Sequence, residues 1–255
     1  MRKLILYNLH DILRNKVVIS YTVFLLLVSI SFFNLDANPA KGVMSLLNIV
    51  LIVLPMVSIV FSTIHVYNAS EFTELLVAQP IRRSTIFIGQ YLGLVISFAV
   101  AVIIGIGLPV LLYYPNITGL TLIGASVILT VVFISLAMLS SVITRDKSKG
   151  IGIAILLWFF FSLIYDGLIL WVLFTFSEYP LEQPILALTA LNPVDLTRII
   201  ILLQLDLSAL MGYTGALYQK FFGTGMGISL SLSILLIWIL LPVFFAVRIF
   251  IRKDL

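Results

Sequence analysis

Hydrophobic positions along this chain fall into six long runs separated by polar gaps. A helix needs about 20 apolar residues to cross the hydrocarbon core of a bilayer. The first run is the shortest and can borrow a turn from its flanks. The pattern therefore predicts an all-α membrane protein with six transmembrane helices in a single transmembrane domain over residues 1–255. The runs cover residues 17–33, 43–66, 86–112, 120–143, 150–176 and 227–249.

Composition agrees with this interpretation. Hydrophobic residues make up 62% of the chain and charged residues only 10%, against about 25% charged residues in an ordinary soluble domain. The chain has no cysteine, which excludes disulfides and thiolate metal ligands. We therefore expect the lipid bilayer to be the main environment of this protein.

Basic residues are sorted between alternate gaps, and this sorting predicts the topology. Twelve of the fifteen Lys and Arg residues fall on one side of the predicted spans, and loops kept in the cytoplasm are enriched in such residues. We expect both termini in the cytoplasm and attribute the net charge of +4 to this sorting, not to nucleic-acid binding. The twelve are Arg2, Lys3, Arg14, Lys16, Arg82, Arg83, Arg145, Lys147, Lys149, Arg248, Arg252 and Lys253; the other three are Lys41, Arg198 and Lys220.

The segment 1–16 precedes the first run and has its own helical pattern. Asp11 lies in this leader, and no small-residue cleavage site follows Phe33, so a retained span is favoured over a cleaved signal peptide. One face of the segment is apolar, which is typical of a helix at the inner membrane interface. An ordinary cytosolic extension is the alternative. The apolar positions are Leu4, Ile5, Leu9, Ile12 and Leu13.

The cytoplasmic gap 67–85 predicts a short helix. Asn68 with Glu71 forms a capping-box pattern, and acidic residues in a first turn suit the helix dipole. Pro80 ends the helix, and Arg82 and Arg83 follow at the headgroups. Spacing predicts one apolar stripe, which must bury itself against the membrane, the span ends or a cytoplasmic partner. The stripe consists of Phe72, Leu75 and Leu76.

Two other gaps stand out. The highly charged gap 144–149 is simplest to interpret as a solvated turn. The outer gap 177–226 is 50 residues long and contains Asn192, Pro193 and Asp195, a strong helix-start pattern. We expect short helices over 185–191 and from Asn192 to about Leu203. They are too short to cross, so they lie in the outer interface, dip into it or dock an external protein.

Asp166 is the only acidic residue well inside a predicted span. A charge near the middle of a membrane helix costs about 2.5–3.5 kcal/mol on insertion scales. With no Lys or Arg deep in another span, we expect Tyr165, Ser162 or a polar group of another helix to satisfy Asp166, unless it is protonated. A role in a transport path or subunit contact and a structural hydrogen bond both stay open.

The sequence contains no pattern for metal binding or for ATP hydrolysis. The two histidines are far apart and no metal-ligand cluster is present, so we expect no bound metal. The phosphate-binding pattern G-x-x-x-x-G-K-[ST] does not occur. The chain is therefore expected to be non-catalytic and not to hydrolyse ATP itself.

The run from Glu71 to Arg83, followed by Ile88-Gly89-Gln90, resembles a signature of ABC-2 type permeases. Phe72 replaces the usual Gly of that signature, and Gln90 replaces the usual Lys. Two further segments are similar to permease subunits of the transporter that matures nitrous oxide reductase. They are Trp158-Phe-Phe-Phe leading to Tyr165-Asp166, and Leu191-Asn-Pro-Val-Asp-Leu-Thr-Arg198-Ile.

The resemblance implies a multi-pass homodimer in the bacterial inner membrane. Each copy would be held by one of two cytoplasmic ATPase subunits, which would bind ATP and Mg while this chain binds no cofactor. A periplasmic partner would rest on Asn192, Pro193, Asp195 and Arg198. The output would be copper–sulfur centre assembly, through transport of a sulfur species or through mechanical signalling. The resemblance implies main coupling residues Glu71, Phe72, Thr73, Glu74, Leu75, Leu76, Arg82 and Arg83, and a second coupling segment with Arg145, Asp146 and Lys147.

Three other functions remain open from the sequence. The first is an ABC-2 exporter of a lipid, glycan or drug. The second is an ion-coupled secondary transporter that uses Asp166, although the chain shows no internal repeat of the kind such proteins carry. The third is an inert assembly scaffold, for which ATP turnover would not respond to substitutions in the predicted coupling segments.

Overall fold

The computed structural model describes residues 2–35, 38–178, 182–205 and 225–252. Within these ranges the chain is helical, without strands, and six helices are long and apolar enough to cross a membrane. The predicted all-α fold with six spans is therefore confirmed. Helices in the first half are α1 (Arg2–Leu13), α2 (Lys16–Leu35), α3 (Pro39–Asn68), α4 (Ser70–Val77), α5 (Arg83–Val102) and α6 (Leu108–Tyr113).

Two of the spans contain a π-helical turn. The third span consists of α5, the π turn η1 (Ile103–Gly107) and α6, and the fifth consists of α8, the π turn η2 (Phe160–Ile164) and α9. The remaining helices are α7 (Ile117–Ile143), α8 (Lys147–Phe159), α9 (Tyr165–Thr175), α10 (Glu182–Ala190), α11 (Pro193–Gln204) and α13 (Gly225–Arg252).

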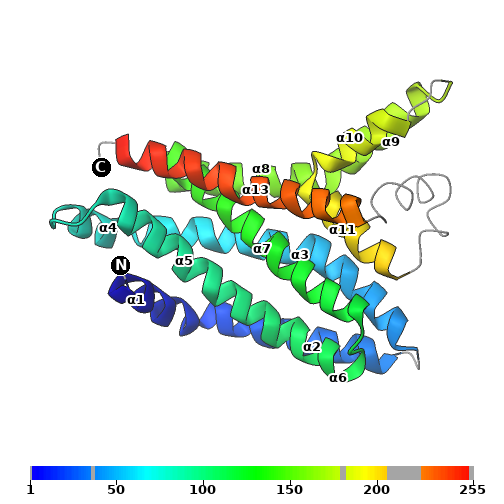
Figure 1. The fold of residues 1–255 in the computed structure, drawn as a ribbon. Coiled ribbons are helices and arrows are strands. Elements are labelled where there is room, and N and C mark those ends of the chain that lie inside the picture. Colours follow the sequence, from blue (N-terminus) through cyan, green and yellow to red (C-terminus); the bar gives the residue numbers. More distant parts are fainter. Residues whose placement is uncertain (1, 36–37, 179–181, 206–224, 253–255) are drawn as a thin grey trace.

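The spans form one elongated bundle (Figure 1). Both termini and α4 lie at one end, whereas α6 and α11 lie toward the other. The bundle is centred on α7, which packs against α3, α5, α11 and α13. In the most apolar stretch of α7, 67% of the residues are buried, whereas the corresponding fraction is 17% in the fifth span and 22% in the sixth. The last two spans therefore offer most of their apolar surface to lipid or to another chain.

The amphipathic N-terminal helix is present as α1 and packs lengthwise along α5. A methyl group added to Gly93 would lie 2.7 Å from the Cβ atom of Asn8. Farther along, Leu13 shares a groove with Val100 and Ile104. Only a small residue at position 93 allows the two helices to approach this closely. The placement of α1 at the membrane interface stays a prediction.

The outer gap contains both short helices expected there. Asn192 caps α11, because its side chain accepts a hydrogen bond from the amide of Val194 at 3.0 Å. The axes of the segments Pro184–Ala190 and Pro193–Gln204 are bent by 106°. Residues of α11 are buried on almost every side, and this helix packs between α3, α7 and α13. Of the three placements expected for these pieces, dipping into the bundle describes α11 best.

Candidate functional site: the coupling surface and the outer polar cluster

The short helix α4 connects the second and third spans at the end that carries both termini. The predicted capping box is wrong: Asn68 ends α3, and Ala69 occupies the N-cap of α4 without a side-chain hydrogen bond. Only one residue separates the two helices. The hydroxyl of Thr73 donates to the carbonyl of Ala69 at 2.7 Å. This bond connects the first turn of α4 to the N-cap residue.

The predicted apolar stripe of α4 is divided between two faces. Leu76 is buried, as is Thr73 three residues earlier, and Phe72 is half-buried. Leu75, in contrast, is 67% exposed. Glu71 and Glu74 are exposed as well. The helix thus anchors itself through one face and presents two carboxylates and a leucine on the other.

Three hydrogen bonds connect this region to its neighbours. Gln90 in α5 donates from its side-chain amide to the hydroxyl of Thr73 at 2.7 Å. Across the bundle, the ammonium group of Lys147 donates to the side-chain carbonyl of Asn68 at 2.7 Å. The hydroxyls of Tyr67 and Thr144 are 2.6 Å apart. The gap 144–149 is therefore joined to the end of α3 and is not an isolated turn.

The gap 144–149 contains the N-cap of α8. Asp146 caps α8, because its carboxylate accepts a hydrogen bond from the amide of Lys149 at 3.0 Å. Arg145, Asp146 and Lys147 are all exposed. At position 150 a glycine is required, since a Cβ atom there would collide with the ring and hydroxyl of Tyr67. This close approach holds the start of the fifth span against the second.

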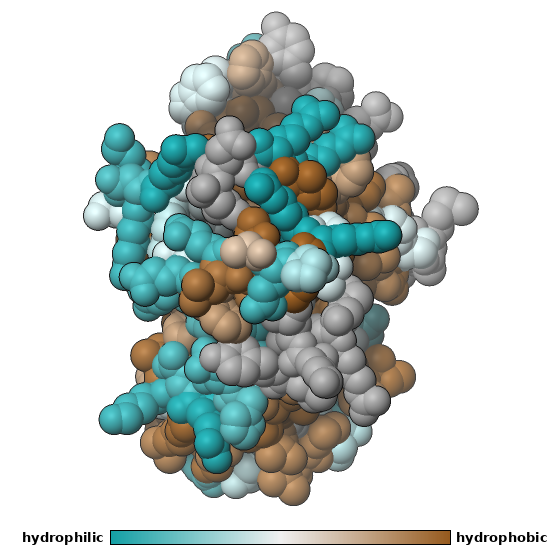
Figure 2. All heavy atoms as spheres, turned by 90° about the vertical axis from the view of Figure 1, so that its left-hand side faces the viewer, coloured by the Kyte–Doolittle hydropathy of each residue, from teal (hydrophilic) through white to brown (hydrophobic). Residues whose placement is uncertain are grey.

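A cavity of about 370 Å³ lies behind α4, between the two gaps. Its polar lining includes Thr73, Glu74, Gln90 and Arg145, and Phe250 of α13 contributes an apolar wall. Arg82 is exposed nearby in sequence, and Arg83 donates to the carbonyl of Ile251 at 3.2 Å. Figure 2 shows this end of the molecule, where hydrophilic residues spread over the surface with apolar residues between them.

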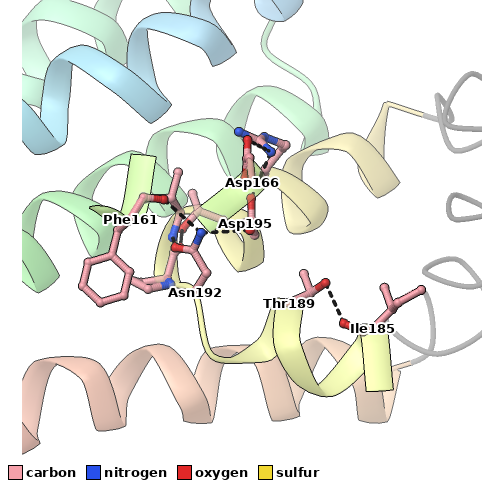
Figure 3. A network of polar contacts seen from close by, with 10 residues as sticks. Phe161, Asp166, Ile185, Thr189, Asn192 and Asp195 are labelled. Carbon is pink, nitrogen blue, oxygen red and sulfur yellow. Dashed lines mark hydrogen bonds and ion pairs between the residues drawn. The ribbon is translucent and has the colours of Figure 1, made fainter. Parts of the chain in front are cut away.

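A second group of polar residues lies where the fifth span meets α11 (Figure 3). The Nη1 atom of Arg198 is 3.0 Å from Oδ2 of Asp166 and 2.9 Å from Oδ1 of Asp195. One guanidinium thus bridges two carboxyl groups from different helices. The side-chain amide of Asn192 donates to Oδ2 of Asp195 at 2.8 Å and to the carbonyl of Phe161 at 3.0 Å. We call Asp166, Asn192, Asp195 and Arg198 the outer polar cluster.

The cluster depends on the π turn η2. A π turn shifts the helical hydrogen-bond pattern by one residue, and here the carbonyl of Phe161 accepts from Asn192. Tyr165, just after the turn, donates to the carbonyl of Leu188 in α10 at 2.8 Å. The fifth span is therefore held to both α10 and α11.

The charges of the cluster are unequal, with two carboxyl groups for one guanidinium. Burial raises the pKa of Asp195 to about 7, and the nearby Asp166 adds to this effect while Arg198 opposes it. A proton on Asp195 would leave a single ion pair between Arg198 and Asp166. In an apolar environment that neutral arrangement costs less than an excess negative charge.

The partner of Asp166 is the third of the expected kinds, a polar group of another helix. Tyr165 bonds to α10, and the hydroxyl of Ser162 is buried without a hydrogen bond among the described residues. Arg198 of α11 binds Asp166, because α11 dips into the bundle. The sequence did not identify Arg198 as this group, since only Lys and Arg residues within the spans were considered as cations.

The residues expected to contact a periplasmic partner are mostly turned inward. Asn192, Pro193 and Asp195 are buried, and Arg198 is 30% exposed in its side chain. The first three therefore hold α11 in place, and any contact with a partner would fall to Arg198 and to the neighbouring exposed Leu191.

Comparison with known proteins decides the family. The family of ABC-2 family transporter proteins matches residues 13–255. The chain belongs to the ABC-2 transporter family. A probable ABC transporter permease protein NosY from Pseudomonas aeruginosa is 32% identical over 80% of this chain and 82% of its own length. A protein of the same name from Stutzerimonas stutzeri is 27% identical over 96% of each chain.

Membership of the ABC-2 family makes this chain the permease of an ABC transporter. It is a multi-pass protein of the bacterial inner membrane, and permease subunits of this kind are not themselves catalytic. The family implies dimerisation and association with an ABC ATPase. In this ABC-2 permease, the segments 158–166 and 191–199 that carried the closer resemblance meet in space, since Asn192 bonds to Phe161.

Proposed function

We propose that this permease converts ATP hydrolysis by a cytoplasmic ATPase subunit into movement at its outer end, as part of nitrous oxide reductase maturation. The NosY names of two similar proteins support this role. The permease would act as a homodimer with two ATPase subunits and a periplasmic partner. Its contribution to copper–sulfur centre assembly would be mechanical signalling through α11.

The observation that carries this proposal is the connection of α4 and of the gap 144–149 to the spans. Force applied to the exposed face of α4 would reach the third span through Thr73 and Gln90. Force applied to the gap 144–149 would reach the second span through Lys147 and Asn68. Since transmembrane helices move as packed units, both inputs would tilt the bundle as a whole.

The outer polar cluster would transfer this tilt. The fifth span begins at Lys147, beside the second gap, and reaches Asp166 near the other end. Its ion pair with Arg198 links it to α11, and α11 also packs on α7 and α13. Movement of the fifth span would therefore reposition α11 and any protein resting on it.

Co-expression with the ATPase and the reductase tests the proposal. Leu75→Asp alters an exposed side chain, so we expect the permease to insert and fold, while ATPase association and assembly of the reductase centre are lost. Leu35→Asp, the same change at a leucine that is 77% exposed at the end of α2 remote from α1, serves as the control. If Leu75→Asp left both ATPase association and centre assembly intact, the coupling role of α4 would be refuted. Export of a sulfur species by wild-type vesicles would replace mechanical signalling as the output.

A further inference from the structure

A groove on the membrane-facing surface runs along α2 beside α3. It has a volume of about 460 Å³ and is lined by Val17, Tyr21, Phe24 and Val57, with Lys16 and Ser20 as its polar members. Val17 and Phe24 are 54% and 46% exposed. Because α2 rises about 1.5 Å per residue, the lining from Lys16 to Phe24 follows the helix for about 12 Å. The groove is thus a shallow, largely apolar depression that is open to its surroundings, with a basic residue at the end near both chain termini.

Lys16 is the charged residue of the groove lining. It is exposed and forms no ion pair with any described residue. The hydroxyl of Tyr21 is enclosed by the protein, so Tyr21 borders the groove only through the apolar part of its side chain. A ligand in the groove would therefore meet the ammonium group of Lys16 at one end and an otherwise uncharged wall.

The positive charge at the groove entrance favours an anionic ligand. Arg14 and Lys16 flank the junction of α1 and α2, and both are exposed. Asp11 is the nearest acidic residue in the sequence and is also exposed. Basic residues at the headgroup level attract anionic lipids. A shallow apolar groove that begins at such a site fits one acyl chain laid along α2.

We propose that this groove binds an anionic phospholipid from the leaflet on the side of the two chain termini. The phosphate would lie at Lys16, and one acyl chain would run past Phe24 and Val57. Since α1 and α2 meet at this entrance, the lipid would also fasten the N-terminal helix to the bundle. This site is separate from α4 and the gap 144–149 and requires no ATPase.

Native mass spectrometry of the purified permease in detergent tests the site. The probes are phosphatidylglycerol and phosphatidylcholine with identical acyl chains. We expect phosphatidylglycerol to be retained preferentially, and Lys16→Gln to weaken its binding about fivefold. Val57→Trp, which fills the groove without changing the charge, should also displace the lipid. Equal retention of the two lipids by the wild type would overturn the proposal.

Two further variants separate a defined lipid site from general electrostatics and from contact with a second permease. Lys149→Gln removes an exposed charge at the same end of the bundle and should leave binding unchanged; a loss equal to that of Lys16→Gln would contradict a defined site. A Ser20→Cys variant that formed disulfides between copies in membranes would show a second permease in the groove and refute lipid binding there.

Discussion

The side-chain amide of Gln90 donates a hydrogen bond of 2.7 Å to the hydroxyl of Thr73, and this contact fastens the short helix α4 to the third span. Both residues are buried. Gln90 is one of the two positions at which the sequence departs from the ABC-2 signature, yet the structure gives it a defined role. Motion of α4 is therefore expected to depend on this pair.

Gln90→Leu should uncouple α4 while leaving the fold intact. Thr73 still donates to the carbonyl of Ala69, so the variant loses one buried hydrogen bond, about 1 kcal/mol. We expect the ATPase to bind normally but permease-stimulated ATP hydrolysis to fall severalfold. Thr73→Val should give the same loss, and the double variant should be no worse than either single one. Additive losses would show that the two residues act separately.

Leu75 and Leu76 should respond differently to the same substitution. Leu75→Asp changes an exposed residue, and we expect weakened ATPase binding with an unchanged melting temperature. Leu76→Asp places a carboxylate at a buried position, which should destabilise the fold by about 3–5 kcal/mol. Thermal unfolding in detergent and ATPase co-purification distinguish these effects. Equal destabilisation by both changes would contradict the orientation of α4.

The two carboxyl groups bound to Arg198 are also expected to differ. Because the pKa of Asp195 is raised, Asp195→Asn resembles the protonated residue and should retain near-normal stability at neutral pH. Asp166→Asn removes the charge that pairs with Arg198 and should cost about 1–2 kcal/mol, since the pair is partly exposed. Melting temperatures of both variants test which substitution costs more stability. A larger loss for Asp195→Asn would show that Asp195, and not Asp166, carries the charge that pairs with Arg198.

Protonation of Asp195 predicts a pH dependence of stability. Its pKa is higher in the folded chain than the ordinary value of 3.8, so the folded state binds the additional proton between that value and about 7. Stability from this group is present at low pH and is lost as the pH rises through the raised pKa. The difference in melting temperature between wild type and Asp195→Asn should therefore change across this range. A constant difference would show that Asp195 does not titrate there.

Gly93→Ala should displace the N-terminal helix. The added methyl group would lie 2.7 Å from the Cβ atom of Asn8, so α1 must shift, at a cost of about 1–3 kcal/mol. Gly124→Ala is the control, because a Cβ atom there meets nothing within 4 Å. Limited proteolysis within the first 15 residues should accelerate only for Gly93→Ala. Similar proteolysis of both variants would argue against close packing of α1 on α5.

Long-range hydrophobic patterning was sufficient to predict the six spans, because the membrane requires about 20 apolar residues for each crossing. The start of α11 was equally predictable from the Asn192–Pro193 capping pattern, which acts within a single turn. The capping box at Asn68 failed for a tertiary reason. Lys147, distant in sequence, binds the Asn68 side chain, and the short connection to α3 places Ala69 at the cap.

The outer polar cluster could not be assembled from the sequence. Arg198 lies in the gap 177–226 between the last two spans, which local rules place outside the membrane, and its pairing with Asp166 requires α11 to dip into the bundle. A hint was available, since Arg198 is one of only three basic residues on the expected outer side. The sequence also could not predict which of Leu75 and Leu76 is buried. Both positions fit a helical apolar stripe, and the packing of α4 on its neighbours decides between them.

Accessibility of a cysteine at position 75 tests the central claim most directly. The native chain contains no cysteine, so Leu75→Cys provides a single site on the exposed face of α4. A membrane-impermeant maleimide should modify this residue in inside-out vesicles but not in intact cells, and bound ATPase should protect it. Labelling from outside intact cells, or labelling unaffected by the ATPase, would contradict the account.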